Sequence, residues 1–235
     1  MARLRISFVR RILDFLFPRY CCICGGRLSA TDEAFCVKCN LHLPRTYFYK
    51  NPKDNEMAQR FWYFIPIENA AALYYYHPHS PATNIILRFK YDGRWDIAEY
   101  IGRVAAKEFM ANNFFEGIDI IVPMPITMRR ELKRGYNQCY HIAIGVREIT
   151  GLPIVTKAVK RIRFTESQTR KNAWERRDNV ASVFRLSDKS KIEGKHVLVI
   201  DDVVTTGSTI LSCCGELLKG GVKAISVLSI AYTHA

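Results

Sequence analysis

The sequence has 235 residues, of which 49% are hydrophobic and 24% are charged. This length suits one α/β domain with a small additional segment, and this composition excludes an intrinsically disordered chain. The net charge of +13 indicates a polyanionic partner, such as nucleic acid, a phosphorylated metabolite or an anionic membrane surface, although part of the surplus can simply serve solubility.

The first predicted element is an amphipathic helix over residues 1–17. Arginines surround apolar residues that recur at helical spacing, namely Ile6, Val9, Ile12, Leu13 and Phe17. Such a helix packs against the rest of the protein or, as the alternative, binds a membrane surface. Neither a secretion signal nor a run of roughly 20 apolar residues is present. We therefore expect a cytoplasmic protein without an integral membrane segment.

Two matched pairs of cysteines follow this helix and indicate a metal site. Two residues separate Cys21 from Cys24 and Cys36 from Cys39, and eleven residues lie between the pairs. Four thiolates at this spacing suit tetrahedral Zn²⁺, and because they leave no open position, the expected zinc is structural. The alternatives are buried or redox-active cysteines, and Cys22 as a competing ligand. Clustered cysteines of this kind also indicate a reducing compartment.

The chain divides into three expected zones. Residues 1–45 hold the basic helix and the four-cysteine zinc-binding segment. Residues 46–80 are rich in aromatic residues and form a connecting, hood-like layer with one strand over 70–76. From residue 81 to 235, helical and strand patterns alternate, which predicts an α/β fold with a parallel sheet flanked by helices.

Within the third zone, apolar spacing predicts three helices and three buried strands. The helices are expected over about 96–110, 138–149 and 210–218. Short runs rich in β-branched residues predict strands over 118–122, 197–200 and 224–230.

Residues 197–209 contain the principal candidate for a ligand site. The strand is expected to end at Asp201 and Asp202, whose carboxylates can accept hydrogen bonds from ribose hydroxyls, directly or through Mg²⁺. A loop rich in hydroxyl groups follows, made of Thr205, Thr206, Gly207, Ser208 and Thr209. Such a loop before a helix binds phosphate through backbone N–H groups and the helix dipole. A solvated strand end and an N-cap would each explain one half, but the combination favours a ribose 5-phosphate site.

This segment resembles the 5-phosphoribosyl-1-pyrophosphate (PRPP) motif of the type I phosphoribosyltransferases. Further motifs narrow the resemblance to the ComF family, which is associated with competence, the uptake of DNA in transformation. Besides the cysteine pairs, the matching pieces are Leu87-Arg88-Phe89-Lys90 with Gly93, Val122-Pro123-Met124-Pro125, Arg134-Gly135-Tyr136-Asn137-Gln138, Arg163-x-Thr165-x-Ser167-Gln168 and Arg177-x-Asn179-Val180. One departure is Tyr136, which stands where phenylalanine is common and preserves the possibility of stacking.

The resemblance implies a type I phosphoribosyltransferase-like sheet that binds PRPP with Mg²⁺. It also implies that the loop after the strand at 118–122 holds the pyrophosphate. The candidates for that role are Met124, Pro125, Arg129, Arg130, Arg134 and Gln138. Arg134 and Gln138 are spaced one helical turn apart, so we expect them to share a helix face toward the cleft. An exposed basic helix start is the alternative explanation for these arginines.

The polar, basic stretch over 161–177 is expected to be a flexible loop that closes over a bound ligand. Its candidate ligand contacts are Arg163, Thr165, Gln168 and Arg177. Alternatively, the stretch grips a single nucleic-acid strand, with Phe164 and Trp174 as stacking platforms, or is merely a solvated loop. Lys90 and Arg94 are further candidates for contact with an anion.

Two functions of different classes follow. In the first, Asp201 and Asp202 are catalytic residues that orient the ribose and metal, while the loop at 205–209 anchors the 5-phosphate and cations stabilise the departing pyrophosphate. In the second, the chain is a non-catalytic competence protein that binds single-stranded DNA and uses the pocket as a phosphate grip or sensor. A third possibility is a partner-binding role, in which the zinc segment offers a surface to a DNA-uptake helicase.

Overall fold

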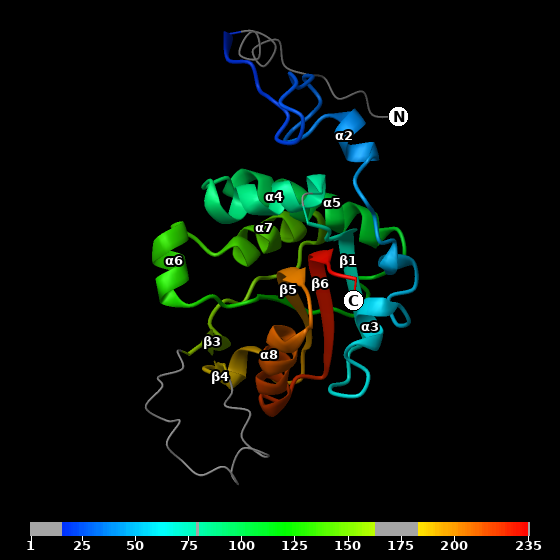
Figure 1. The fold of residues 1–235 in the computed structure, drawn as a ribbon. Coiled ribbons are helices and arrows are strands. Elements are labelled where there is room, and N and C mark those ends of the chain that lie inside the picture. The colour runs from blue at the N-terminus through cyan, green and yellow to red at the C-terminus, as the bar shows by residue number, and fades with distance from the viewer. Residues whose placement is uncertain (1–15, 79, 163–182, 235) are drawn as a thin grey trace.

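The computed structural model describes residues 16–78, 80–162 and 183–234. Its centre is a four-stranded parallel sheet in the order β1-β6-β5-β2. The strands are β1 (Asn69–Tyr75), β2 (Ile120–Pro123), β5 (His196–Val204) and β6 (Ala224–Tyr232). Helices flank this sheet (Figure 1), so the expected α/β class is confirmed. Within the described part of the chain, no helix is long and apolar enough to cross a membrane.

Strand β5 is longer than the sequence indicates, because it runs through the acidic pair to Val204 instead of ending there. Asp201 lies opposite Ser229 of β6, and Val204 lies opposite Tyr232. The backbone therefore continues to pair with β6 on both sides of Asp202, irrespective of the acidic side chains. The carboxylates interrupt the apolar run without interrupting the strand.

The main helices are α4 (Pro81–Tyr91), α5 (Trp95–Met110), α6 (Met128–Arg134), α7 (Gln138–Thr150) and α8 (Ser208–Lys219). The predicted helices correspond to α5, α7 and α8. Helix α4 was not predicted, although its start carries a recognisable signal. Ser80 accepts a hydrogen bond from the Thr83 backbone at 3.2 Å, and Pro81 occupies the first turn, where proline is well tolerated.

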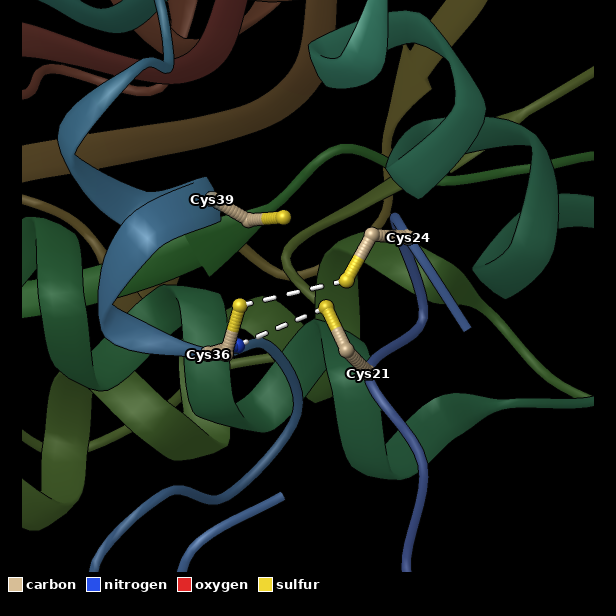
Figure 2. A group of neighbouring side chains, drawn as sticks. All are labelled: Cys21, Cys24, Cys36 and Cys39. Carbon is tan, nitrogen blue, oxygen red and sulfur yellow. Dashed lines mark hydrogen bonds between the residues drawn. The ribbon is translucent and has the colours of Figure 1, made fainter. Parts of the chain in front are cut away.

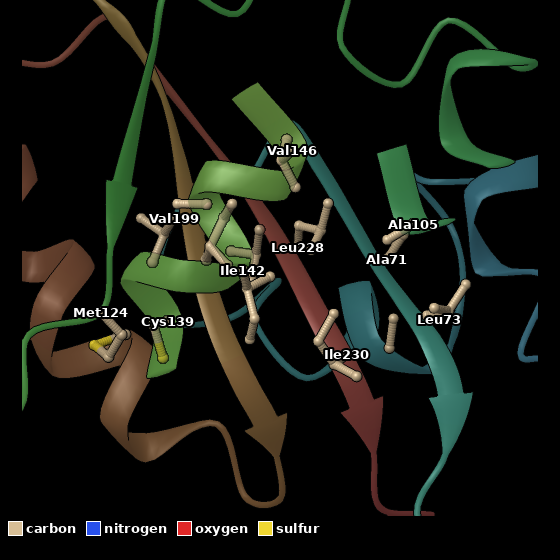
Figure 3. Packing of buried hydrophobic residues seen from close by; sticks show 14 of the residues in the cluster. Ala71, Leu73, Ala105, Met124, Cys139, Ile142, Val146, Val199, Leu228 and Ile230 are labelled. Atoms are coloured by element: carbon tan, nitrogen blue, oxygen red, sulfur yellow. The ribbon is translucent and has the colours of Figure 1, made fainter. Parts of the chain in front are cut away.

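Helices α5 and α7 are in backbone contact because each presents a glycine to the other. A Cβ atom on Gly102 would lie 2.2 Å from the carbonyl oxygen of Ile142, and one on Gly145 would lie 2.0 Å from that of Glu99. On its other side, α7 directs Ile142 and Val146 toward the buried face of the sheet (Figure 3). This packing fixes the first turn of α7 beside the carboxyl ends of β2 and β5.

The shorter elements are α2 (Val37–Leu41), η1 (Phe48–Lys50), α3 (Glu56–Gln59), η3 (Lys189–Lys191) and an antiparallel pair of strands, β3 (Val159–Arg161) and β4 (Phe184–Leu186). No sequence pattern predicted the β3–β4 pair. It flanks residues 163–182, so the expected ligand contacts Arg163, Thr165, Gln168 and Arg177 lie outside the described residues. Most of the expected N-terminal helix also lies outside them.

The cysteine-containing segment lies next to α4 and α5 (Figure 1). The ring of Phe35 packs edge-on against Tyr100 of α5 with 5.0 Å between centroids. Arg103 of α5 pairs with Glu33 at 2.6 Å and with Glu148 of α7 at 3.0 Å. The expected strand of the connecting layer is β1, an edge strand of the main sheet. The division into three zones stays a prediction.

Candidate functional site

The first candidate site lies where β2 and β5 end beside the start of α7. The backbone N–H of Met124, just after β2, donates to the carbonyl of Ile200 at 2.8 Å. The side chain of Asn137 donates to the carbonyl of Met124 at 3.1 Å, and its oxygen accepts from the Cys139 backbone at 2.9 Å. These bonds hold the loop after β2, the start of α7 and the acidic end of β5 together.

Asp202 is buried and both of its oxygens have a strong partner. Lys90 of α4 places its Nζ 2.8 Å from Oδ1. Gln138 of α7 donates from Nε2 to Oδ2 at 2.7 Å. All three of these side chains were candidates in the sequence, although Lys90 was only a further candidate for contact with an anion. The structure brings them together.

The neighbouring Asp201 titrates unusually because it is enclosed. Its Oδ1 accepts from the backbone N–H of Asp202 at 2.9 Å and from the Cys139 thiol at 3.6 Å. Burial, followed by the charge of Asp202, raises the pKa of the Asp201 carboxyl to about 7, although Lys90 opposes this effect. Asp201 can therefore exchange a proton near neutral pH, whereas Asp202 is paired with a cation.

The candidate phosphate loop connects β5 to α8. Gly207 caps the helix at a φ of +79°, and a Cβ atom there would lie 2.9 Å from the Phe61 ring, so both backbone and space require glycine. Thr206 and Ser208 are exposed, and the hydroxyl of Thr206 donates a hydrogen bond to that of Ser208 at 3.1 Å. No described side chain caps α8, and its first turn carries no acidic residue. The backbone N–H of Ser208 donates to Oγ1 of Thr206 at 3.4 Å, and the N–H groups of Thr209 and Ile210 are available to an anion.

The expected pyrophosphate residues separate into two groups. Arg129 and Arg130 are exposed on α6, and the Arg134 guanidinium lies 5.3 Å from the Tyr91 ring centroid. None of the three is in an ion pair with a described residue. Gln138 lies apart from these arginines and donates a hydrogen bond to Asp202. The expectation that Arg134 and Gln138 share one helix face is wrong, because α6 ends at Gly135 (φ 81°) and α7 begins anew after Asn137.

Arg161 of β3 was included in the expected flexible stretch but not among its ligand contacts. Its guanidinium lies 5.4 Å from the Phe184 ring centroid. Burial, followed by the positive charge of Arg130, lowers the pKa of Arg161, while Asp201 acts in the opposite direction. Arg161 is therefore within electrostatic range of both Arg130 on α6 and Asp201. Arg94, by contrast, is exposed and pairs with Asp96 at 2.7 Å, away from these groups.

The four expected metal ligands converge (Figure 2). The sulfur atoms of Cys21, Cys24, Cys36 and Cys39 all lie within 4.8 Å of one another, and those of Cys24 and Cys36 are 3.9 Å apart. Zn–S bonds of about 2.3 Å in a tetrahedron place sulfurs at roughly this spacing. Backbone N–H groups of Ile23 and Cys36 also point at the Cys21 sulfur, at 3.5 and 3.4 Å. The cluster can hold a metal ion.

Cys22 lies outside this cluster and contributes to the core instead. Burial, followed by the charge of Cys21, raises the pKa of the Cys22 thiol to about 11. A neutral, buried thiol behaves as a small apolar side chain.

Residues 133–235 match the family described as phosphoribosyl transferase domain. This match and the flanked parallel sheet define the chain as a protein with a phosphoribosyltransferase fold. Among solved structures, the chain is similar to glutamine PRPP amidotransferase from B. subtilis, with a TM-score of 0.44 and 19% identity over 61% of this chain and 30% of that chain.

Relatives among curated proteins narrow this class. Competence protein F of Haemophilus influenzae is 30% identical over 159 residues, which cover 66% of this chain and 69% of that protein. DNA utilization protein YhgH of Escherichia coli K12 is 28% identical over 221 residues, 91% of this chain and 90% of that protein. The chain belongs to the ComF family, as the sequence motifs predict.

Proposed function

We propose that this ComF family member binds PRPP with Mg²⁺ at the carboxyl end of β5 and acts in DNA uptake. One observation carries the proposal: the buried acidic pair and the exposed phosphate loop are consecutive on one strand and the following helix. A ribose on Asp201 and Asp202 would thus have its 5-phosphate directed to residues 205–209. The names of the relatives, which refer to competence and DNA utilization, support the role in DNA uptake.

The oxygen ligands of this site suit Mg²⁺. Carboxylates are the hard ligands that this ion prefers, and both aspartates lie in one group with Cys139 within 4.8 Å. Burial raises the pKa of the Cys139 thiol well above its ordinary value, so the thiol stays neutral and is not a ligand. When bound, Mg²⁺ would neutralise charge on the pyrophosphate.

Transfer of the phosphoribosyl group to an unknown acceptor is the activity we propose for this site. The bond between the anomeric carbon and pyrophosphate would break as an acceptor bonds to that carbon. Met124 and Pro125 would position the pyrophosphate, and cations would stabilise its charge, namely Arg129, Arg130 and Arg134. No residue has to become covalently attached.

Calorimetric titration of the zinc-loaded chain with PRPP and MgCl₂ tests this site. We expect saturable binding, and a loss of at least about tenfold in affinity for Asp202→Asn, because a charged hydrogen-bond acceptor contributes roughly 1.5–3 kcal/mol. Asp54→Asn is the matched control, because Asp54 is exposed and also accepts from a glutamine, Gln59, at 3.0 Å. Absence of saturable binding to the unaltered chain would refute the proposal.

A second candidate function, binding of single-stranded DNA, is favoured by a separate surface. Tyr91, Trp95 and Tyr140 are all exposed, and we call them the aromatic surface. The rings of Trp95 and Tyr140 lie 5.5 and 5.8 Å from that of His141, and Arg134 lies over Tyr91. Exposed rings beside cations suit stacked bases and phosphates.

Trp95→Ala tests this second function, with Trp62→Ala as the matched control. The two tryptophans are 48% and 49% exposed, but only Trp95 belongs to the aromatic surface. Loss of a stacked base corresponds to about 5- to 150-fold in affinity for a labelled single strand. Binding should also weaken steeply as salt increases. Equal affinities of the two variants would exclude the aromatic surface as the binding site.

A further inference from the structure

Gln138, in the first turn of α7, carries a polar atom that lacks a partner. The residue is only 5% exposed. Its Nε2 donates to Oδ2 of Asp202 at 2.7 Å, but its Oε1 is buried and has no hydrogen-bond partner among the described residues. The amide cannot be turned around to correct this. Asp202 is paired with Lys90 and is thus an ionised acceptor, so the nitrogen has to face it.

A buried acceptor without a donor is costly, and such atoms in folded proteins usually have a role. Because Oε1 is an acceptor, it repels the oxygens of a phosphate or pyrophosphate and attracts a hydroxyl. Beside Gln138 lie two further groups that accept hydrogen bonds, the carboxyls of Asp201 and Asp202. A ligand that fits this cluster must therefore bring several donors close together, as adjacent hydroxyl groups do.

We propose that Oε1 of Gln138 accepts a hydrogen bond from a ring hydroxyl of the bound sugar phosphate, and thereby makes the site selective for ribose over deoxyribose. This inference rests on the proposed ribose phosphate site. It gives Gln138 a role at the sugar in place of the anion-binding role expected from the sequence. A deoxy analogue leaves the buried oxygen unpaired, and sites built to pair with a hydroxyl discriminate strongly against ligands that lack it.

Binding of three ligands to the zinc-loaded full chain, without added Mg²⁺, tests the inference. The ligands are ribose 5-phosphate and its 2-deoxy and 3-deoxy analogues, measured by calorimetry. We expect at least one analogue to bind about 5- to 100-fold more weakly than ribose 5-phosphate. In Gln138→Met, which keeps the size but removes the acceptor, this preference should fall to about twofold or less.

Gln59→Met is the matched control, since Gln59 also donates its amide to a carboxylate but is exposed. It should keep the full preference. Thermal unfolding verifies that each variant is folded, and Gln138→Leu replaces Gln138→Met if the latter does not fold. Equal affinity of the unaltered chain for all three ligands would overturn the inference and leave the site intact. A preference for ribose 5-phosphate that persists in Gln138→Met would also overturn the inference. If none of the ligands binds, the inference is likewise overturned, while the titration with PRPP and MgCl₂ separately decides on the proposed site.

Discussion

At the residue scale, the Asp201 carboxyl makes the stability of the fold depend on pH. Its pKa is raised from 3.8 to about 7, first by burial and then by the charge of Asp202. Between these two values the unfolded chain has lost the proton while the folded chain still holds it. The free energy of unfolding therefore falls as pH rises through this window, as far as this group is concerned, and stops falling above about pH 7.

Asp201→Asn removes this titration while keeping the size of the side chain. The free energy of unfolding of the variant, relative to the unaltered chain, should increase from pH 5 to pH 7 by up to about 1.4 kcal/mol per pH unit. Above that range the difference should become constant. Urea denaturation at several pH values measures it, with Asp54→Asn as an exposed control substitution. A difference independent of pH would contradict a raised pKa at Asp201.

The residues of this site differ in how far the sequence reveals them. Asp201, Asp202 and the loop at 205–209 are consecutive, so a local pattern suffices to find them. Lys90 meets Asp202 only because the fold packs α4 against α5 and so brings it to the acidic pair of β5, and no local spacing encodes that contact. The orientation of the Gln138 amide is likewise set by its partners. This orientation determines whether the oxygen or the nitrogen of the amide is left for a group of the ligand.

At the scale of elements, the α5–α7 contact positions the site, and Gly102→Ala tests its tightness. The new methyl carbon would lie 2.2 Å from the Ile142 carbonyl oxygen, which is backbone and can yield only if the helices move apart. We expect a loss of about 2–3 kcal/mol in the free energy of unfolding. Binding of PRPP should weaken as well, because Gln138 begins the same helix.

Gly215→Ala is the control for this substitution. Gly215 lies within α8, and a Cβ atom there would meet nothing within 4 Å. Alanine should therefore raise the free energy of unfolding by up to about 1 kcal/mol through helix propensity alone. Urea denaturation compares the two variants. If Gly102→Ala is as stable as the unaltered chain, the two helices are not held at the distance seen here.

The same scale shows where sequence patterns are informative and where they are not. Apolar periodicity predicts α5, α7 and α8 because each helix lays one face on the core. It places the end of β5 too early, since backbone pairing with β6 continues beneath polar side chains. The spacing of one helical turn between Arg134 and Gln138 is also misleading, because the left-handed Gly135 separates their helices. For Arg134 and Gln138, Gly135 between them was the available sequence signal for the end of a helix.

At the scale of the whole molecule, the cysteine segment joins the main fold through a few specific contacts. Phe35 packs on Tyr100, and Arg103 links Glu33 of this segment to Glu148 of α7. Arg45, farther along, pairs with Glu108 of α5 at 3.0 Å. The segment therefore contacts α5, the helix whose glycine contact positions α7. The conformation of the cysteine segment depends in turn on the interactions that hold its four sulfur atoms together.

Zinc is the ion we expect there, and its removal should unfold this segment before the sheet. Binding free energy at a structural zinc site is folding free energy, because the unfolded segment has no preformed site. Elemental analysis should find zinc in the unaltered chain and in Cys22→Ala, whose side chain lies outside the cluster, but not in Cys39→Ala. After chelation, hydrogen exchange should accelerate over residues 20–43 well before it does in β5 and β6. Zinc retained by Cys39→Ala, or equal acceleration throughout the chain, would contradict a structural site confined to this segment.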